Sequence, residues 1–409
     1  MTASISQTMA QLGFAPVIAF LTRKAREAPA DVVVAGDPSV LDHFTPEAGS
    51  ALGGAALAAG GRGGETQEVP AARVFPHLGV VYGTVEPAGL SALRASPVVR
   101  AVKPAAQLSL IRPVTAAVPS EPRGTVWGVG HLQAPDLWAQ GWTGAGVRVA
   151  HLDTGVDPNH PCLAGAVVEF AEFDETGRRV PDAAARDGDR DGHGTHTAAT
   201  IAGREVDGVR VGVAPGAELC SALVIEGGDI TARILGGMDW AIGVGARVLS
   251  MSLGIRGLVN SFLDLVAILR DSGVLPVVAI GNEGPGTSRS PGNYAAALSV
   301  GAHDQGGAVA AFSSSQRFQR RVHPLTPDVV APGVDVVSAA PAGGWQSLSG
   351  TSMATPHVAG LAALLMQAHP DAGVAEIERA ILESAELGDM PAERANRGAV
   401  NGLRALARL

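Results

Sequence analysis

The sequence predicts an α/β protein with a mostly parallel sheet, preceded by a smaller α+β domain. Three observations predict this class. Short apolar runs alternate with helical segments after residue 147, the amino-terminal region has a strand–helix–strand pattern of its own, and a proline-containing stretch separates the two. Parallel strands joined by helices are buried on both faces and appear as continuous apolar runs. A chain of 409 residues has room for two such domains.

Residues 1–112 are predicted to form the small α+β domain, and residues 113–124 a linker that contains Pro113, Pro119 and Pro122. Exposed linkers of this kind are preferred sites of proteolysis. Within the first domain, three runs are expected to be strands, namely residues 15–21, 78–85 and 98–102, and residues 31–35 are a further apolar stretch. Residues 89–96 are expected to form a short helix, and the Gly/Ala-rich residues 48–64 a flexible loop.

Residues 125–409 are predicted to form the larger domain. Its expected strands are 147–152, 217–225, 247–252, 274–280 and 298–302, and its expected helices are 193–202, 230–244, 261–271 and about 350–367. In such sheets the functional side chains lie at the carboxyl ends of the strands. Asp153, Ser252 and Asn282 occupy those positions.

Bulk composition excludes several functions. The net charge of −9 argues against a nucleic-acid-binding protein, which needs a basic surface. No apolar run approaches the roughly 20 residues of a membrane span. The amino terminus is polar and lacks the basic start of a signal peptide, so we expect a cytoplasmic protein, with secretion as the alternative. The two cysteines, Cys162 and Cys220, form no disulfide framework, and we expect free thiols, with a pair as the alternative.

Four short motifs carry the chemistry. They are HLDTGVD at 151–157, DGHGTHT at 191–197, AIGNEG at 279–284 and GTSMATPHVAG at 350–360. Together, and in this order, they resemble the subtilisin-like serine proteases, the subtilase or peptidase S8 family, in which the triad runs Asp, His, Ser. The resemblance extends from about Trp127 to the end of the chain. It implies a three-layer sandwich around the parallel sheet.

The resemblance assigns each motif a role. Ser352 would be the nucleophile, His193 the base that removes its proton, and Asp153 the group that orients the imidazole. Asn282 and the backbone N–H of Ser352 would stabilise the oxyanion. A serine at a helix start also lies near unpaired N–H groups and the positive end of the helix dipole. The implied activity is a serine endopeptidase that acts on proteins or peptides through an acyl-enzyme.

Substrate would bind as an added strand. By resemblance, Ser252, Leu253 and Gly254 would form one edge of the cleft, and Gly227 and Gly228 the opposite edge. Two charged residues lie near the expected pocket for P1, the residue whose carbonyl is attacked. Arg289 in that pocket would favour an acidic P1 and Glu283 a basic one, and the alternative is that Arg289 points to solvent.

We expect catalysis to need no metal or other cofactor. His193 and His196 lack an evident third metal ligand. The loop 187–192 begins like a calcium loop, but Ala198 stands where the bidentate glutamate is required, which favours a solvated acidic loop. Relatives carry a calcium-ligating Asp where this chain has Cys162, so a structural calcium is doubtful here.

The amino-terminal region has the layout of a subtilisin propeptide, which would act as a folding chaperone and inhibitor. We therefore expect a zymogen that cleaves itself between about Leu108 and Thr125, with its own propeptide as a partner. Two alternatives stay open at this point. One is an intracellular processing protease of narrow specificity, and the other is a catalytically silent module that holds peptides in the cleft.

Overall fold

The computed structural model describes residues 15–22, 38–44, 72–118 and 121–409. The chain forms two compact units, residues 1–106 and 107–409. The apolar stretch at 31–35 and the loop expected at 48–64 lie outside the described residues. The two units divide earlier than the boundary expected at residue 112, because residues 109–112 make hydrogen bonds to the second unit.

The first unit contains an antiparallel four-stranded sheet in the order β2-β3-β1-β4. Alternate apolar residues of β1, such as Val17, Ala19 and Leu21, pack into a core with Leu93 of the helix. This matches the expected strand–helix–strand pattern. Its described elements are β1 (Ala15–Leu21), η1 (Pro38–His43), β2 (Ala72–Phe75), β3 (Val80–Val85), α5 (Pro87–Ala95) and β4 (Val99–Pro104).

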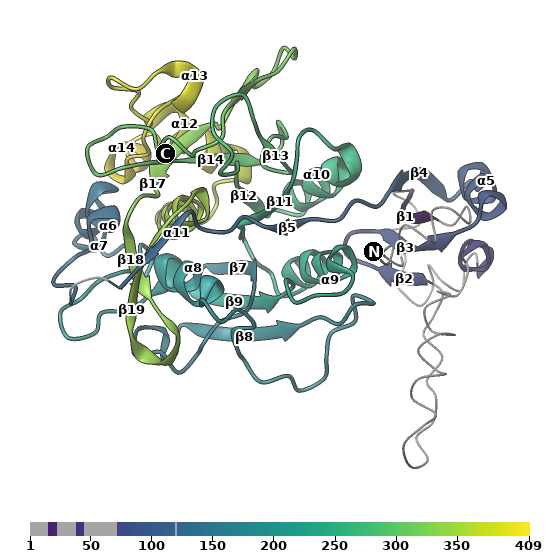
Figure 1. The fold of residues 1–409 in the computed structure, drawn as a ribbon, viewed down its shortest axis with the longest axis horizontal. Coiled ribbons are helices and arrows are strands. Elements are labelled where there is room, and N and C mark those ends of the chain that lie inside the picture. Colours follow the sequence, from purple (N-terminus) through teal and green to yellow (C-terminus); the bar gives the residue numbers. More distant parts are fainter. Residues whose placement is uncertain (1–14, 23–37, 45–71, 119–120) are drawn as a thin grey trace, which may run out of the picture. The chain divides into compact units, whose positions relative to one another are not determined.

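The second unit is built on a seven-stranded sheet in the order β17-β14-β12-β10-β7-β9-β8, in which every neighbouring pair is parallel (Figure 1). The inner strands are buried at successive positions, which point to opposite faces, so both faces of the sheet are covered. The strands are β7 (Arg148–Asp153), β8 (Val167–Glu172), β9 (Glu218–Leu223), β10 (Val248–Met251), β12 (Leu275–Ala279), β14 (Leu298–His303) and β17 (Val329–Pro332).

Five of these strands coincide with the predicted runs, and β8 and β17 were not predicted. β8 is an edge strand in which only Ala171 is buried, so it lacks the apolar run of an inner strand. β17 is buried but contains only four residues and ends at Pro332, too short a run to be distinguished by periodicity.

The long helices are α8 (His193–Ala202), α9 (Ile230–Gly243), α10 (Leu263–Asp271), α11 (Thr351–Ala368) and α12 (Val374–Ser384). α11 packs against the inner strands and against α8. Small residues allow this approach: a Cβ on Gly360 would lie 3.2 Å from the carbonyl oxygen of Ile201 in α8. No helix among the described residues is long and apolar enough to cross a membrane.

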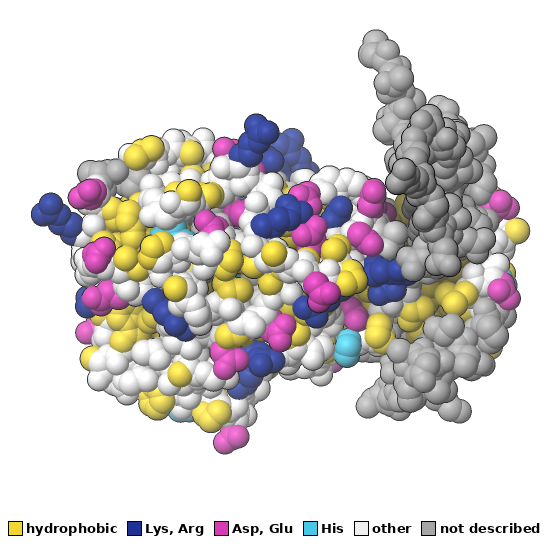
Figure 2. Space-filling model, turned by 90° about the horizontal axis from the view of Figure 1, so that it is seen from below, with side chains coloured by type: hydrophobic (Ala, Val, Ile, Leu, Met, Phe, Trp, Pro, Cys, Tyr) yellow, Lys and Arg dark blue, Asp and Glu magenta, His cyan; other side chains and the backbone are white. Residues whose placement is uncertain are grey.

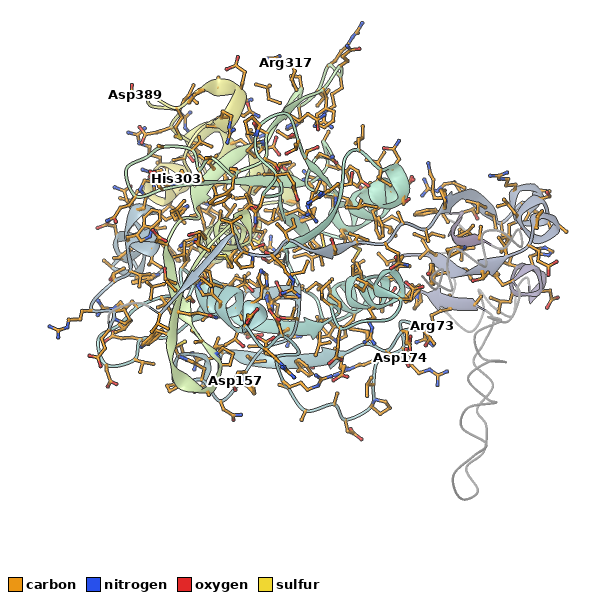
Figure 3. The ribbon with its side chains drawn as sticks, viewed as in Figure 1. Arg73, Asp157, Asp174, His303, Arg317 and Asp389 are labelled. Atoms are coloured by element: carbon orange, nitrogen blue, oxygen red, sulfur yellow. The ribbon has the colours of Figure 1, made fainter. Side chains whose placement is uncertain are left out.

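Shorter elements complete the second unit. One of them, the β15–β16 hairpin, carries Arg317 away from the sheet (Figure 3). On the face shown in Figure 2, basic and acidic side chains of the described residues are interspersed. The strands are β5 (Ser109–Leu110), β6 (Thr115–Ala117), β11 (Leu253–Arg256), β13 (Arg289–Ser290), β15 (Gln316–Arg317), β16 (Leu325–Thr326), β18 (Val336–Ala339) and β19 (Trp345–Ser349). The helices are α6 (Trp127–His131), α7 (Ala134–Trp138), α13 (Ala392–Ala395), α14 (Gly402–Leu406), η2 (Pro161–Leu163), η3 (Asn260–Phe262) and η4 (Pro341–Gly343).

Candidate active site

Three neighbouring strands bring the predicted polar residues to one edge of the sheet. Asp153 ends β7, Ser252 follows β10, and Asn282 comes shortly after β12. Because parallel strands share a carboxyl edge, these residues converge although they are distant in sequence. His193 begins α8 and Ser352 lies in the first turn of α11.

Asp153 and His193 form a buried pair. His193 Nδ1 lies 2.6 Å from Asp153 Oδ1, and each side chain is only 1% exposed. Burial alone would lower the pKa of His193, but the charge and hydrogen bond of Asp153 outweigh it and raise that pKa. Burial likewise acts to raise the pKa of Asp153, and His193 reverses this and lowers it. The carboxylate also accepts a hydrogen bond from the Thr154 N–H at 2.8 Å, which fixes its orientation.

The hydroxyl of Ser352 is engaged by the chain itself. Ser352 Oγ donates to the carbonyl oxygen of Ile111 over 2.6 Å. Among the described residues, His193 Nε2 is buried and has no hydrogen-bond partner. The serine and the histidine are therefore not hydrogen-bonded to each other in this structure.

Pro356 and Ser252 together support the helix turn that contains Ser352. Pro356 has no N–H and cannot donate to the Ser352 carbonyl one turn earlier. The hydroxyl of Ser252 donates to this carbonyl instead, over 3.2 Å. A residue from the end of β10 thus completes the first turn of α11.

Asn282 presents a donor to the cleft. Its Oδ1 accepts hydrogen bonds from the N–H and the hydroxyl of Thr351, both at 2.9 Å. Because a backbone N–H can only donate, these bonds define the amide orientation and direct Nδ2 the other way. Nδ2 donates to the carbonyl oxygen of Arg112 at 2.9 Å. The side chain is therefore aimed at the backbone next to Ser352.

Residues 108–112 lie in the cleft as an added strand. β5 pairs antiparallel with β11, with Leu110 opposite Leu253 and Ser109 opposite Gly254. The Ile111 N–H donates to the carbonyl of Ser252 at 3.0 Å. The edge expected at 252–254 thus binds an extended backbone, and the backbone it binds is the protein's own. The side chains of Leu108, Leu110 and Ile111 are buried there.

The chain continues from the cleft as a second strand. β6 pairs with β19, with Thr115 opposite Ser349, and Val114 N–H donates to the Ser349 carbonyl at 2.8 Å. Part of the segment expected to be a linker therefore forms an edge strand of the small sheet β18-β19-β6. None of the backbone hydrogen bonds of the described residues joins Gly227 or Gly228 to residues 107–111, and their place on the opposite edge of the cleft stays a prediction. From the same loop, Asp229 Oδ1 accepts a hydrogen bond from Gln107 Nε2 at 3.1 Å.

Comparison with known protein families gives a direct match for this site. Residues 144–403 match the model of the Subtilase family, Peptidase S8. The chain is 37% identical to the M-protease of Shouchella clausii (strain KSM-K16) over 309 residues, which cover 75% of this chain and 74% of that protein. The chain belongs to the subtilase family. It is accordingly a serine endopeptidase that acts on proteins or peptides.

Two further relatives of this subtilase match over a shorter range. Subtilisin Savinase of Lederbergia lenta is 41% identical over 247 residues, which cover 60% of this chain and 85% of that protein. Subtilisin E of Bacillus subtilis (strain 168) is 37% identical over 250 residues, 60% of this chain and 61% of that protein. The sequence resemblance to subtilisin-like proteases is confirmed.

The two charged residues near the expected P1 pocket are paired with each other. Arg289 is only 8% exposed, so the alternative that it points to solvent is wrong. Its Nε donates to Glu283 Oε1 at 2.9 Å. The opposite charges that were expected to compete for substrate therefore neutralise one another.

A polar network behind Asp153 was missed by the sequence analysis. His151 Nδ1 is 3.0 Å from Ser221 Oγ, and His151 Nε2 is 2.9 Å from Thr197 Oγ1. Thr197 Oγ1 in turn lies 3.4 Å from Asp153 Oδ2. The sequence did contain a signal for this network. His151 and Asp153 are two residues apart in β7, and residues two apart in a strand share a face.

The loop 187–192 supports the site and is not fully solvated. Asp187 accepts hydrogen bonds from the hydroxyl of Thr154 at 2.8 Å and from the N–H and hydroxyl of Thr195 at 2.7 and 2.6 Å. It thereby ties the turn after β7 to the first turn of α8. A neighbouring tie is made by Asp157, labelled in Figure 3, whose Oδ2 accepts from the Ala342 N–H at 3.0 Å.

The remaining candidate ligands have other roles. His196 Nε2 lies 2.9 Å from the Val336 carbonyl and must donate to it, which leaves that nitrogen unable to bind a metal. Across the described residues, no group of three His, Cys, Asp or Glu side chains is placed to hold a metal ion. Cys162 and Cys220 are both free and buried, and burial raises the pKa of each thiol to about 12.

Proposed function

We propose that Ser352, His193 and Asp153 are the catalytic triad of this endopeptidase. The observations that carry the proposal are the buried Asp153–His193 pair, which leaves His193 Nε2 without a partner, and the contact of Ser352 Oγ with a peptide carbonyl. His193 takes the Ser352 proton as the Oγ attacks the carbonyl carbon, and then gives it to the departing amine. Water releases the acyl group by the same steps in reverse order.

Oxyanion stabilisation is assigned to Asn282 Nδ2 and the backbone N–H of Ser352. Nδ2 is held by Thr351 in a donating orientation toward the cleft, and the Ser352 N–H lies in the unpaired first turn of α11. Donors that are fixed before the reaction need no reorganisation when negative charge develops on the carbonyl oxygen. Neither donor requires a metal, and we propose that catalysis persists when divalent cations are removed by EDTA.

The protein is further proposed to be a zymogen that cuts its own Ile111–Arg112 bond. Ser352 Oγ contacts the Ile111 carbonyl, the Ile111 N–H binds Ser252, and Arg112 is exposed on the departing side. Asn282 Nδ2 donates here to the next carbonyl, that of Arg112, so the Ile111 carbonyl must replace it at this donor when the bond is cut. Cleavage there lies within the 108–125 range expected from the sequence. Residues 108–111 would keep their strand pairing after the cut, which supports product-like inhibition by the amino-terminal fragment.

The test combines active-site labelling with the site of cleavage. Purified wild-type protein should react with a fluorophosphonate probe and produce a fragment that begins at Arg112, as read by mass spectrometry. Ser352→Ala protein should do neither, whereas Ser272→Ala, which alters an exposed serine, should behave as wild type. Cleavage of pure Ser352→Ala protein at the same bond would overturn self-processing. Absence of labelling in cut, folded wild-type protein from which the amino-terminal fragment has been removed would overturn the triad.

Two related properties stay predictions. Co-elution of fragments 1–111 and 112–409 on gel filtration would support a bound propeptide, and separation would count against it. Peptide-library profiling distinguishes broad degradation from narrow processing. The cytoplasmic location rests on the amino-terminal residues alone, and residues 1–14 lie outside the described part of the chain. Cell fractionation tests it against secretion.

A further inference from the structure

Arg289 lies between the two backbone walls of the P1 pocket. β13 pairs with β11, placing Arg289 opposite Arg256, and the Arg289 N–H donates to the Ile280 carbonyl at 2.9 Å. A Cβ built on Gly254 would lie 3.0 Å from Arg289 Cβ, and one on Gly281 would lie 3.1 Å from Arg289 Cγ. The side chain stem therefore fills the space that the two glycines leave between the segments 252–254 and 279–281.

The guanidinium is held in place at its far end. Besides the bond from Nε to Glu283 Oε1, Nη2 also donates to that oxygen, and Nη1 donates to the Gly254 carbonyl at 3.2 Å. Glu283 Oε2 accepts from the Asn282 N–H at 3.1 Å. Swinging Arg289 out of the pocket would leave the Glu283 carboxylate, 18% exposed, without its main partner. The arginine is thus a fixed wall of the pocket and not a movable flap.

The bound segment directs Ile111 toward this wall. Side chains two apart in a strand point to the same side. Ser109 Oγ accepts from Arg289 Nη1 at 3.1 Å, so Ile111, two residues later, points toward the same side of β5. Ile111 is 1% exposed. A β-branched residue of moderate length is thus enclosed at the position next to Ser352.

We propose that Arg289 limits the depth of the P1 pocket, so that this subtilase cleaves after small and β-branched aliphatic residues and discriminates against phenylalanine and tyrosine. The Arg289 charge is matched by Glu283, so the pocket favours neither acidic nor basic P1 residues. Size alone then selects the residue. Ile111 at the proposed maturation site is one example of the favoured class.

The experiment uses the mature enzyme and fluorogenic peptides Gln-Leu-Ser-Leu-X, with X as Ala, Val, Ile, Leu, Phe, Tyr, Glu or Lys. Wild-type enzyme should show a higher kcat/KM for Ile and Val than for Phe and Tyr. Arg289→Gly should raise the Phe/Ile ratio of kcat/KM by roughly 10–200-fold, the range in which pocket size discriminates substrates. It should also raise the Lys/Ile ratio, because Glu283 then lacks its partner.

Two further variants separate the effect of pocket size from the effect of the Glu283 charge. Arg289→Gly with Glu283→Gln should keep the gain for Phe and lose the gain for Lys. Arg256→Ala is the matched control: Arg256 also lies near Glu283, at 3.3 Å, but its side chain is 77% exposed, so its loss opens no pocket and the Phe/Ile ratio should stay constant.

A wild-type preference for Phe over Ile, or an unchanged ratio in Arg289→Gly, would overturn the proposal. The proposal rests on the endopeptidase site proposed above. Fluorophosphonate labelling of each variant distinguishes a failure of the pocket proposal from a failure of the triad proposal. A labelled enzyme with the wrong preference contradicts the pocket assignment alone, whereas an unlabelled one contradicts the triad.

Discussion

His151 Nε2 and Asp153 Oδ2 lie 3.7 Å apart, and both side chains are 1% exposed. Thr197 Oγ1 is near both, 2.9 Å from the ring nitrogen and 3.4 Å from the carboxylate oxygen. Burial lowers the pKa of His151 to about 4, so the imidazole is neutral at neutral pH. A neutral histidine therefore supports the carboxylate that orients His193.

Replacement of His151 by valine should destabilise the fold. It removes the side-chain partner of the buried Ser221 hydroxyl and one of several partners of Thr197, and an unsatisfied buried polar group costs about 1–3 kcal/mol. kcat should also fall, because Thr197 then rearranges next to Asp153. Urea unfolding and steady-state kinetics measure both effects. His151→Gln, which retains polar atoms, should lose less of each, and a valine variant as stable as wild type would contradict the network.

Buried histidines should make the protein sensitive to acid. Burial lowers the pKa from 6.5 to about 4 in His151, His303 and His357, and to about 3 in His196. The unfolded chain then binds more protons than the folded one below pH 6.5. Stability is thus retained above pH 6.5 and lost as the pH falls toward 4, by about 3 kcal/mol for a histidine shifted to pKa 4.

Urea unfolding of Ser352→Ala protein between pH 4 and 7 measures this dependence, since the variant cannot digest itself. His303→Leu (His303 is labelled in Figure 3) should take up about one proton fewer on unfolding and show a shallower slope. The raised pKa of His193 acts in the opposite sense, because it stabilises the fold at low pH. This contribution is the same in both proteins and does not affect the difference between their slopes. Equal slopes would contradict the assignment.

The fall of kcat/KM at acid pH should have its midpoint above pH 6.5. Activity needs neutral His193, whose pKa is raised by Asp153 despite burial, so kcat/KM falls as the pH drops through that raised value. Asp153→Asn removes the charge and should move the midpoint to lower pH. It should also reduce kcat by about 10⁴-fold, as seen for the corresponding change in another serine protease. A midpoint that stays in place in Asp153→Asn would show that another group titrates.

Asn282→Ala should lower kcat with little change in KM. The Nδ2 donor acts on charge that develops in the transition state, and loss of one such donor costs about 10²–10³ in kcat, a magnitude measured in subtilisin itself. The variant also removes the acceptor for Thr351, so its melting temperature is measured alongside. Asn293→Ala, which alters a buried asparagine bonded to Gly257 and Ser288, is the comparison. A large rise in KM at constant kcat would contradict the assignment.

The side chain of Gln367 should contribute strongly to the free energy of unfolding. Its Oε1 accepts from three consecutive backbone N–H groups, those of Thr143, Gly144 and Ala145, at 2.7, 2.7 and 3.2 Å. Gln367→Leu leaves them without this acceptor, and we expect a loss of about 1–3 kcal/mol in the free energy of unfolding. Gln305→Leu, at an exposed position, should change it by less than about 0.5 kcal/mol. Equal effects would contradict the prediction.

The sequence could predict features that depend on local spacing. Inner strands such as 274–280 are continuous apolar runs, and the motifs around Asp153, His193, Asn282 and Ser352 each fit within a few residues. A strand end or a helix start fixes where such a side chain lies relative to its own element. This local information was sufficient for the α/β class and for the family.

Only the tertiary structure decided which distant residues meet. Ser352 and Ile111 are 241 residues apart, and no local pattern places that carbonyl against that hydroxyl. The pairing of Arg289 with Glu283 and the enclosure of His151 also depend on how separate strands and loops pack. Burial and partner choice are properties of the assembled fold, because they depend on side chains from other elements, and they determine the pocket and the pKa values on which the predictions above rest.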